Sequence, residues 1–366
     1  MPRSIANRKE SHIQVCLSKK VESEETAGFE DIHLIHRAVP EMDVEEVSTS
    51  TKLFRHSLSA PIVIEAITGG VPSAGKINGR LAEAAEKLGV AMGVGSQRIA
   101  IEDPSVEHTF KIVREKAPSA FIIANLGAAQ MSMGYDVDEA KRAVDMISAD
   151  ALAIHFNPLH EAVQFQGDLR FKGVLSRLKE VAKAVKVPVI AKETGAGIAA
   201  EEALKLEQAG VAAVDIGGLG GTDWTKIEYY RAKKEGSRLN LAKTKTFAGW
   251  GIPTAASVIE VRKSTRLVVI ASGGIRNGVH VAKSIALGAE AAGFALPLLK
   301  PAVRGVKEVE GKILATIDEL RTAMFLTASK NIEELGKAPL VVNGRILNWV
   351  HQRGFDIESY AKRLPR

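Results

Sequence analysis

The chain has 366 residues, of which 46% are hydrophobic and 25% charged, and its formal net charge is +6. Such a balance is typical of an enzyme with a large core, and the length allows one decorated barrel or two smaller domains. The single cysteine, Cys16, excludes an internal disulfide framework and a cysteine-built zinc cluster, and it fits a reducing cytoplasm.

The charge pattern and the hydropathy exclude further classes. No apolar stretch approaches the roughly 20 residues of a membrane span, and the basic, polar segment 1–10 lacks the apolar core of a signal peptide. Basic residues are interleaved with acidic ones and not with aromatic ones, so we expect an anionic small molecule as ligand and no nucleic acid or membrane as partner.

From residue 60 onward, short apolar runs alternate with amphipathic segments. The runs predict strands at 61–67, 90–94, 120–126, 151–156, 187–192, 212–216, 267–271 and 289–294. The segments predict helices that include 76–88, 137–147, 175–185, 199–209 and 279–287. Several strands are apolar on both faces, as in a parallel sheet covered by helices. Eight such units in succession predict an α/β fold, the (β/α)8 TIM barrel.

Three additions decorate the expected barrel. Residues 1–59 form an N-terminal extension with a basic start, 60–300 the barrel, and 301–366 a helical C-terminal tail. Residues 222–254 form a long inserted loop after strand six. A loop of that length in a compact domain is more often a lid or a binding element than a simple connection.

Two turns of small residues close the last two strands. They read Ala271-Ser272-Gly273-Gly274-Ile275-Arg276 and Gly293-Phe294-Ala295-Leu296. In this barrel the loops after strands seven and eight commonly bind phosphate, because glycine admits close backbone approach and helix-start N–H groups hold an anion. Arg276 can add a two-pronged contact. Ordinary glycine-rich turns are the alternative interpretation.

The other strand ends carry amide, hydroxyl and cationic side chains, which suit a flat ligand with a phosphate. FMN is the cofactor that we expect, with Thr68 and Asn125 at the polar edges of the flavin. Lys192 would lie near the flavin N1–C2 carbonyl, where a cation stabilises an anionic reduced ring. For Lys192 alone, an ion pair with Glu193 is the alternative.

The segment after strand four offers imidazole, amide and carboxylate groups within seven residues, from His155 to Glu161. Glu161 is a candidate Mg2+ ligand, because Mg2+ combines one carboxylate with water and ligand phosphates. The spacing of His155 and His160 matches no zinc motif, and structural histidines are the alternative. Near the N-terminus, Arg8, Lys9 and His12 form either a solvated basic tail or a clamp for a diphosphate.

Together these motifs resemble the type 2, FMN-dependent isopentenyl-diphosphate delta-isomerases of archaea and bacteria. The resemblance covers nearly the whole chain and is carried by Arg8-Lys9, Thr68-Gly69-Gly70, the segment 92–98, His155-Phe156-Asn157, the segment 220–224, the segment 250–254 and the segment 272–276. The Gly-Ser-Gln-Arg string at 95–98 and the Trp-Gly-Ile-Pro-Thr string at 250–254 are the specific ones.

The resemblance implies the interconversion of isopentenyl and dimethylallyl diphosphate. FMN reduced by NADPH or NADH would protonate the alkene at one end and remove a proton at the other, with no net redox change. A homotetramer or homo-octamer is implied as well.

The resemblance also implies roles for individual residues. The implied FMN-binding residues are Ala66, Ile67, Thr68, Ser96, Asn125, Lys192, Thr222, Gly274, Ile275, Arg276, Ala295 and Leu296. The implied substrate-binding residues are Arg8, Lys9, Ser96, Gln97, Arg98 and His160, with Glu161 on Mg2+. The implied catalytic residues are His155, Asn157, His160, Lys192 and Trp224, of which Trp224 would help to exclude water.

One position departs from the family pattern, because His160 stands where the family has glutamine. Imidazole differs from an amide in reach and can carry charge, so we expect weaker substrate binding or slower turnover. Two other functions stay open. An FMN-dependent oxidoreductase of the 2-hydroxy acid oxidase type needs an Arg/His pair late in the barrel, where His280 lies in a helix pattern. The other is a phosphate-ligand binding or regulatory protein without turnover.

Overall fold

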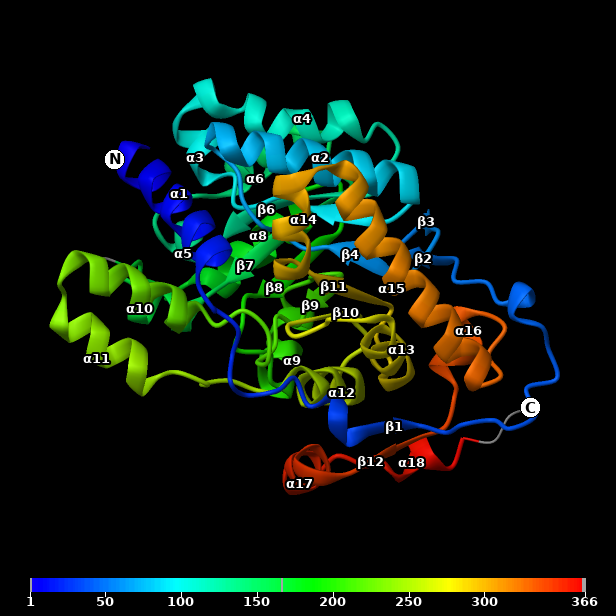
Figure 1. Ribbon diagram of the computed structural model, residues 1–366. Coiled ribbons are helices and arrows are strands. Elements are labelled where there is room, and N and C mark those ends of the chain that lie inside the picture. Colours follow the sequence, from blue (N-terminus) through cyan, green and yellow to red (C-terminus); the bar gives the residue numbers. More distant parts are fainter. Residues whose placement is uncertain (1, 166, 364–366) are drawn as a thin grey trace.

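The computed structural model describes residues 2–165 and 167–363, and its centre is a closed barrel of eight parallel strands. The order around the barrel is β10-β11-β4-β5-β6-β7-β8-β9 (Figure 1). The strands are β4 (Ile62–Ile64), β5 (Ala91–Gly93), β6 (Ile122–Gly127), β7 (Ala151–Phe156), β8 (Val189–Glu193), β9 (Ala213–Asp215), β10 (Val268–Ser272) and β11 (Ala291–Phe294). Each coincides with a predicted strand, so the predicted TIM barrel is confirmed.

Helices cover the outside of the barrel. The long helices that follow the successive strands are α2 (Pro72–Leu88), α4 (His108–Lys116), α6 (Val137–Met146), α8 (Val174–Ala184), α9 (Ala200–Gln208), α12 (Thr254–Ser264), α13 (Gly278–Leu287) and α15 (Val306–Leu326). The helices predicted from the sequence are confirmed, although α2 begins four residues before the predicted position 76, at Pro72. Proline is favoured in the first turn because its missing N–H would have no intrahelical partner there.

Additional helices lie in the loops at the carboxyl end of the strands, which is where a TIM barrel carries its site. They are α3 (Arg98–Glu102), α5 (Ala128–Ser132), α7 (Pro158–Val163) and α14 (Leu296–Arg304).

Side chains alternate along the strands, so every second residue points into the barrel. The lower interior is filled by apolar residues, among them Val63, Ile123, Ile190 and Ile270. A hairpin of β2 (Thr51–Leu53) and β3 (His56–Leu58) adds Leu53 and Leu58 to this same cluster. The barrel interior is therefore a packed core below and opens only toward the carboxyl ends of its strands.

The N-terminal extension and the C-terminal tail pack against each other. Strand β1 (Ile32–Leu34) pairs antiparallel with β12 (Leu340–Val342), and Figure 1 shows them side by side, one blue and one red. The tail also contains α16 (Ile332–Gly336), α17 (Gly344–Gln352) and α18 (Glu358–Ala361). The predicted helical tail is thus helical apart from β12, a strand that forms only by pairing with β1 near the other end of the chain.

The insertion after β9 is a helical hairpin and not the predicted loop. It consists of α10 (Trp224–Glu235) and α11 (Arg238–Thr246). The side chain of Asp223 caps the first turn of α10 by accepting from the Thr225 N–H, and Gly236 ends the helix with φ +74°. Helix α10 packs on α7 and on α1 (Pro2–Ser18), which crosses the mouth of the barrel (Figure 1).

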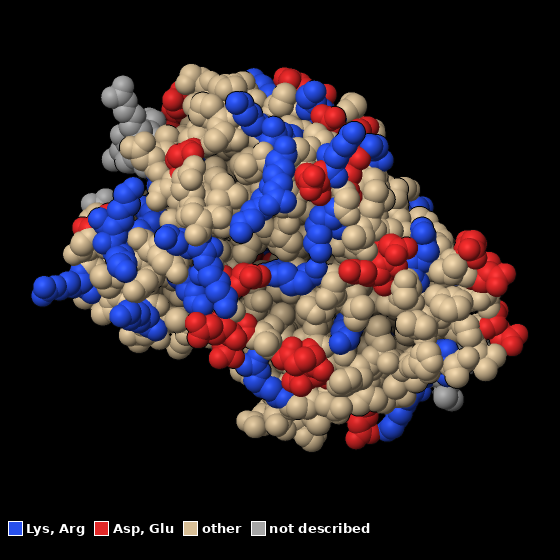
Figure 2. All heavy atoms as spheres, in the orientation of Figure 1, with Lys and Arg blue, Asp and Glu red and all other residues tan. Residues whose placement is uncertain are grey.

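Surface charges are interspersed. Figure 2 shows basic and acidic side chains mixed across the visible face, as the sequence indicates. In the part of the chain that the structure describes, no helix is both long enough and apolar enough to cross a membrane.

A buried carboxylate fastens the tail to the barrel. Glu260 of α12 is completely buried, and it accepts hydrogen bonds from Trp349 Nε1 at 2.8 Å and Arg353 Nε at 3.1 Å, both on or next to α17. Its second oxygen accepts from the Ala200 N–H at 3.0 Å, at the start of α9. One side chain thus joins three elements.

Replacing this carboxylate should destabilise the fold. We expect Glu260→Ala to lower the free energy of unfolding by about 3 kcal/mol, because it leaves buried donors and a guanidinium without their acceptor. Glu201→Ala removes the exposed partner of the same Arg353 and should lower the free energy of unfolding far less, because water screens an exposed ion pair. Denaturant unfolding of both variants tests this, and equal losses would contradict it.

Candidate functional site

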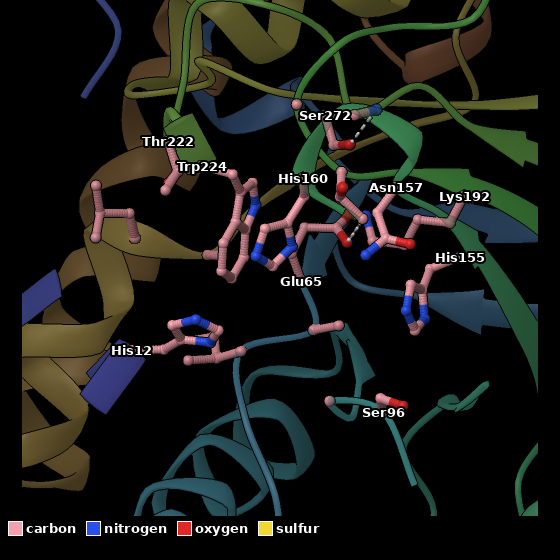
Figure 3. Close-up of a pocket in the computed structure, with 18 of the residues that line it drawn as sticks. His12, Glu65, Ser96, His155, Asn157, His160, Lys192, Thr222, Trp224 and Ser272 are labelled. Carbon is pink, nitrogen blue, oxygen red and sulfur yellow. Dashed lines mark hydrogen bonds and ion pairs between the residues drawn. The ribbon is translucent and has the colours of Figure 1, made fainter. Parts of the chain in front are cut away.

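A cavity of about 290 Å3 opens at the carboxyl ends of the strands, and residues at the ends of all eight strands line it. Helix α1 contributes Arg8, Lys9 and His12 from above. Figure 3 shows side chains from these separate elements converging on one space. With one exception, every residue that the sequence predicts for the site lies in the lining.

Gln97 is the exception, because its side chain lies outside the lining between Ser96 and Arg98, which are part of it. Its side chain is completely buried and points away from the cavity. Its amide donates to the Ala143 carbonyl at 2.8 Å and accepts from the Asn125 N–H at 2.9 Å. Gln97 therefore holds β6 in place and acts on the site only through Asn125.

The two small-residue turns lie together at one side of the cavity. Gly273 and Gly274 have φ of +94° and +78°, a region that side chains other than glycine rarely adopt. A Cβ on Gly273 would collide with the backbone of Gly218, and one on Gly274 would lie 2.6 Å from the Ala27 Cβ. The backbone thus forms a close-fitting cradle next to the starts of α13 and α14, which suits a phosphate.

Arg276 lines the cavity, but its guanidinium is already engaged. Nε donates to Glu22 Oε1 at 2.8 Å and Nη1 donates to the Ile275 carbonyl at 2.8 Å. A two-pronged contact that uses Nε would require Arg276 to leave Glu22, so the backbone cradle is the preformed part of the phosphate site.

The floor of the cavity is a buried charged cluster. Lys192 Nζ lies 2.6 Å from Asp215 Oδ2 and 2.7 Å from Glu65 Oε2. Burial alone would lower the pKa of Lys192, but the carboxylates of Asp215 and Glu65 raise it above its usual value, so the ammonium stays charged. A fixed cation therefore lies beneath the cavity.

The alternative pairing of Lys192 with Glu193 does not occur. Glu193 Oε2 accepts from the N–H groups of Thr194, Gly195 and Ala196 at 2.5 to 2.6 Å. Burial raises the pKa of Glu193 to about 7, although these amides favour its charged form.

His155 is held as a neutral imidazole. Its Nδ1 lies 2.7 Å from Asn125 Oδ1, an acceptor, so the ring proton is on Nδ1. Burial, followed by the nearby His160 and Lys192, lowers the pKa of His155 to about 3.

A second polar cluster covers the cavity. Glu228 of α10 accepts from His12 Nε2 at 2.8 Å and from His160 Nε2 at 3.0 Å, while Arg231 Nη1 donates to its other oxygen at 2.8 Å. The His160 ring stacks on Trp224 with centroids 4.3 Å apart (Figure 3). This cluster joins α1, α7 and α10 and closes one side of the cavity.

The cluster of His12, His160, Glu228 and Arg231 is an ion network and not a metal centre. Ligand atoms of His12, His160 and Glu228 lie within 4.8 Å of one another, as a metal site requires. However, Arg231 Nη1 lies 3.3 Å from His12 Nε2 and donates to both oxygens of Glu228. The guanidinium therefore supplies the positive charge that a metal ion would otherwise bring. Burial lowers the pKa of His12 to about 4, and the hydrogen bonds from both histidines lower the pKa of Glu228, so the imidazole of His12 is neutral and the carboxylate ionised.

Glu161 presents a carboxylate to the cavity from α7. Asn157 Nδ2 donates to Oε1 at 3.0 Å, and the Asp168 N–H donates to Oε2 at 2.7 Å. Gln164 Nε2 also donates to Oε2, at 3.2 Å, whereas Oε1 keeps a further lone pair. This oriented oxygen donor fits a Mg2+ ion whose other ligands are water and phosphate.

The cations that we expect to bind an anion come from a different part of the chain than the glycine turns. They are Arg8 and Lys9 of α1 and Arg98 at the start of α3. Lys9 Nζ donates to the Ser96 carbonyl at 2.9 Å. Burial, and then the adjacent Arg8, lower the pKa of Lys9 to about 7. Arg98 is anchored by Glu102 and Asp168 at 2.8 and 3.0 Å. An incoming anion would stabilise the charged form of Lys9.

Comparison with known proteins agrees with this lining. Residues 130–342 match the FMN-dependent dehydrogenase family. The chain is 49% identical to an isopentenyl-diphosphate delta-isomerase of Methanosarcina barkeri, over 99% of this chain and 98% of that protein. It is 46% identical to the Methanothermobacter thermautotrophicus isomerase and 47% identical to that of Pyrococcus furiosus, each over 98% of this chain. These two alignments cover 99% and 92% of the relatives.

The chain belongs to the isopentenyl-diphosphate delta-isomerase family.

Solved structures share the fold but little sequence with this family member. A lactate oxidase of Pediococcus acidilactici has a TM-score of 0.65 at 16% identity, over 94% of both chains. A mandelate oxidase has a TM-score of 0.62 at 17% identity, over 93% of this chain and 99% of that one. These similarities support the barrel alone.

Sequence reasoning missed three carboxylates of the site. Glu65 and Asp215 occur two residues after inward-facing Val63 and Ala213, so strand alternation alone predicts that they point into the barrel. Glu228 lies four residues after Trp224 and thus on the same face of α10. That signal is visible only if the insertion is read as a helix.

A side chain at Gly274 should weaken flavin binding. We expect Gly274→Ala to lower the affinity for FMN about tenfold or more, because the added Cβ would crowd Ala27 and the Gly220 carbonyl, at 2.6 and 2.7 Å, and shift the cradle. Gly236→Ala is the matched control, since Gly236 has φ +74° with nothing near its Cβ position. Fluorescence titration of apoprotein with FMN measures both, and equal affinities would refute the assignment.

Proposed function

We propose that this chain interconverts isopentenyl diphosphate and dimethylallyl diphosphate, using reduced FMN and Mg2+ with no net redox change. The observation that carries the proposal is a single cavity with two anion-binding regions. One is the backbone cradle at Gly273 and Gly274, and the other is the set of cations Arg8, Lys9 and Arg98. A phosphate-bearing cofactor and a diphosphate substrate together need two such regions.

The oxidase alternative finds less support in the lining. It requires an Arg/His pair late in the barrel, and His280 is the histidine available there. The His280 Nδ1 lies 3.3 Å from the Gly274 carbonyl and its ring stacks on Phe29, so it is outside the cavity lining. The family membership favours the isomerase over a phosphate-binding protein without turnover as well.

In the proposed reaction, bound reduced FMN supplies an electron-rich ring that stabilises positive charge on the alkene and exchanges protons with it. The FMN phosphate would be held by the turns 272–276 and 293–296, and the ring polar edges would meet Thr68 and Asn125. Lys192, held between Asp215 and Glu65, would supply the cation at the ring edge.

The chain's other residues position the substrate and keep water out. Arg8, Lys9 and Arg98 would bind the diphosphate, and Glu161 would hold Mg2+ against it. His155 keeps its proton on Nδ1 against Asn125, which would hold the ring in one orientation in the cavity lining. The ring of Trp224, which stacks on His160, covers the cavity and would protect a cationic carbon from capture by water.

We also propose that NADPH or NADH reduces FMN, that the protein acts in the cytoplasm, and that it assembles as a homotetramer or homo-octamer. The resemblance to the isomerase family and the single cysteine support these points.

Anaerobic proton NMR in D2O tests the function directly. With isopentenyl diphosphate, FMN, dithionite and Mg2+, we expect loss of the exo-methylene signal, new methyl signals and deuterium incorporation. The same mixture with a hydroxy acid and oxidised FMN should give no keto acid. Keto acid formation without isomerisation would favour the oxidase.

Restoring the family residue at position 160 should raise turnover. In His160→Gln the side-chain amide can still donate to Glu228, while the imidazole that now fills the space against Trp224 is removed. We expect kcat/KM to rise several-fold. His351→Gln, an exposed change on α17, should leave it unchanged. Equal rates for His160→Gln and the parent protein would show that the histidine is tolerated.

A further inference from the structure

Glu65 occupies an unusual position in the floor of the cavity. It follows β4, and its side chain is 7% exposed. The carboxyl group fits there because the neighbouring strand β11 has glycine at position 293, where a Cβ would overlap Glu65 Oε1. The space left by Gly293 is therefore used by a carboxyl group of the same chain.

The two oxygens of Glu65 are unequally satisfied. Oε2 lies 2.7 Å from Lys192 Nζ, but Oε1 is buried and has no hydrogen-bond partner among the described residues. In Asp215, by contrast, Oδ2 meets Lys192 and Oδ1 accepts from Ser272 Oγ. Because an unpaired buried oxygen is costly, a group that would complete its hydrogen bonding is expected from the cavity side.

The unequal contacts decide which carboxyl group carries a proton. Two carboxylates cannot share one lysine in a buried site without repulsion, so the less satisfied one is protonated first. Burial, and then the charge of Asp215, raise the pKa of Glu65 to about 8. The other groups facing this cluster are Lys192, which stays charged, and His155 of β7, which is neutral.

The ionisation state of Glu65 sets the charge beneath the cofactor. When Glu65 is ionised, Lys192 faces two carboxylates and the cluster has a net charge of −1. When Glu65 is protonated, the charges of Lys192 and Asp215 cancel. The negative charge that a flavin gains on reduction is repelled when Glu65 is ionised, and this repulsion is relieved when Glu65 is protonated. Reduction must therefore draw a proton to Glu65 whenever that carboxyl is ionised beforehand.

We propose that Glu65 is a proton store for the flavin, taking up one proton at its free oxygen when the cofactor above Lys192 is reduced. This inference rests on the proposed binding of FMN and is independent of the isomerase reaction. The two electrons come from the reductant, dithionite or reduced nicotinamide. The proton comes from solvent through the open cavity, and oxidation of the flavin returns it.

The consequence is an added pH dependence of the flavin midpoint potential. One extra proton for two electrons makes the potential fall about 30 mV per pH unit more steeply, since a tenfold change in a two-electron equilibrium is 29.6 mV. The extra slope should begin near pH 8 and extend upward, because a negatively charged ring raises the pKa of Glu65 further. Below about pH 7, Glu65 is protonated in both states and the extra slope disappears.

Potentiometric titration of the FMN-loaded protein from pH 6 to 10 tests the proposal. We expect the extra slope in the parent protein and its loss in Glu65→Gln, which keeps the shape and removes the proton. Glu193→Gln is the matched control, because Glu193 is a second buried carboxyl of the same lining whose partners are backbone amides. It should retain the slope.

The outcomes separate this proposal from the function proposed above. Equal slopes in the parent and Glu65→Gln, or a slope lost only in Glu193→Gln, would overturn the role of Glu65 while FMN binding stands. Failure of the parent protein to bind FMN in fluorescence titration would overturn both. A Glu65→Ala variant that binds FMN and also lacks the extra slope would support the proposal if Glu65→Gln folds poorly.

Discussion

The site depends on one geometric constraint, the alternation of side chains along the strands of a closed barrel. The inward-facing residues deep in the barrel are apolar, and the next inward-facing residue toward the carboxyl end of several strands is polar or glycine. This second layer forms the floor of the cavity, which consists of Glu65, Asn125, His155, Lys192, Asp215, Ser272 and Gly293. Because neighbouring strands are hydrogen-bonded in register, these side chains are fixed relative to one another before any ligand arrives.

The cover of the cavity follows a different logic. Its parts come from α1, α7 and α10, which are far apart in the chain and meet at the single carboxylate of Glu228. Two imidazoles and one arginine satisfy that buried carboxylate. A network of this kind gives one defined arrangement of the rings of His160 and Trp224, and it ties the N-terminal helix to the rest of the site.

The comparison with oxidases separates fold from chemistry. Structures of mandelate and lactate oxidases share the barrel at 16–17% identity. The lining of this chain has cations on α1 and α3, a carboxylate on α7, and no histidine of α13. Function in such a barrel is decided by the loops and strand ends, since the barrel itself is common to many reactions.

The sequence by itself determined the barrel and much of the candidate site. Strands that are apolar on both faces, and helices between them, leave few arrangements other than eight β/α units, and strand ends such as Asn125 and Lys192 must then meet at one edge.

The tertiary structure decided what those residues contact. Gln97 turned out to support β6, Lys192 to pair with Asp215 and Glu65, and Arg276 to bind Glu22. These contacts join residues on different strands or segments, and local spacing does not specify distances between such residues. The same holds for β12, which exists only because β1 supplies its hydrogen bonds, and for the cover, where Glu228 matters only once α10 has formed and packed on α1 and α7.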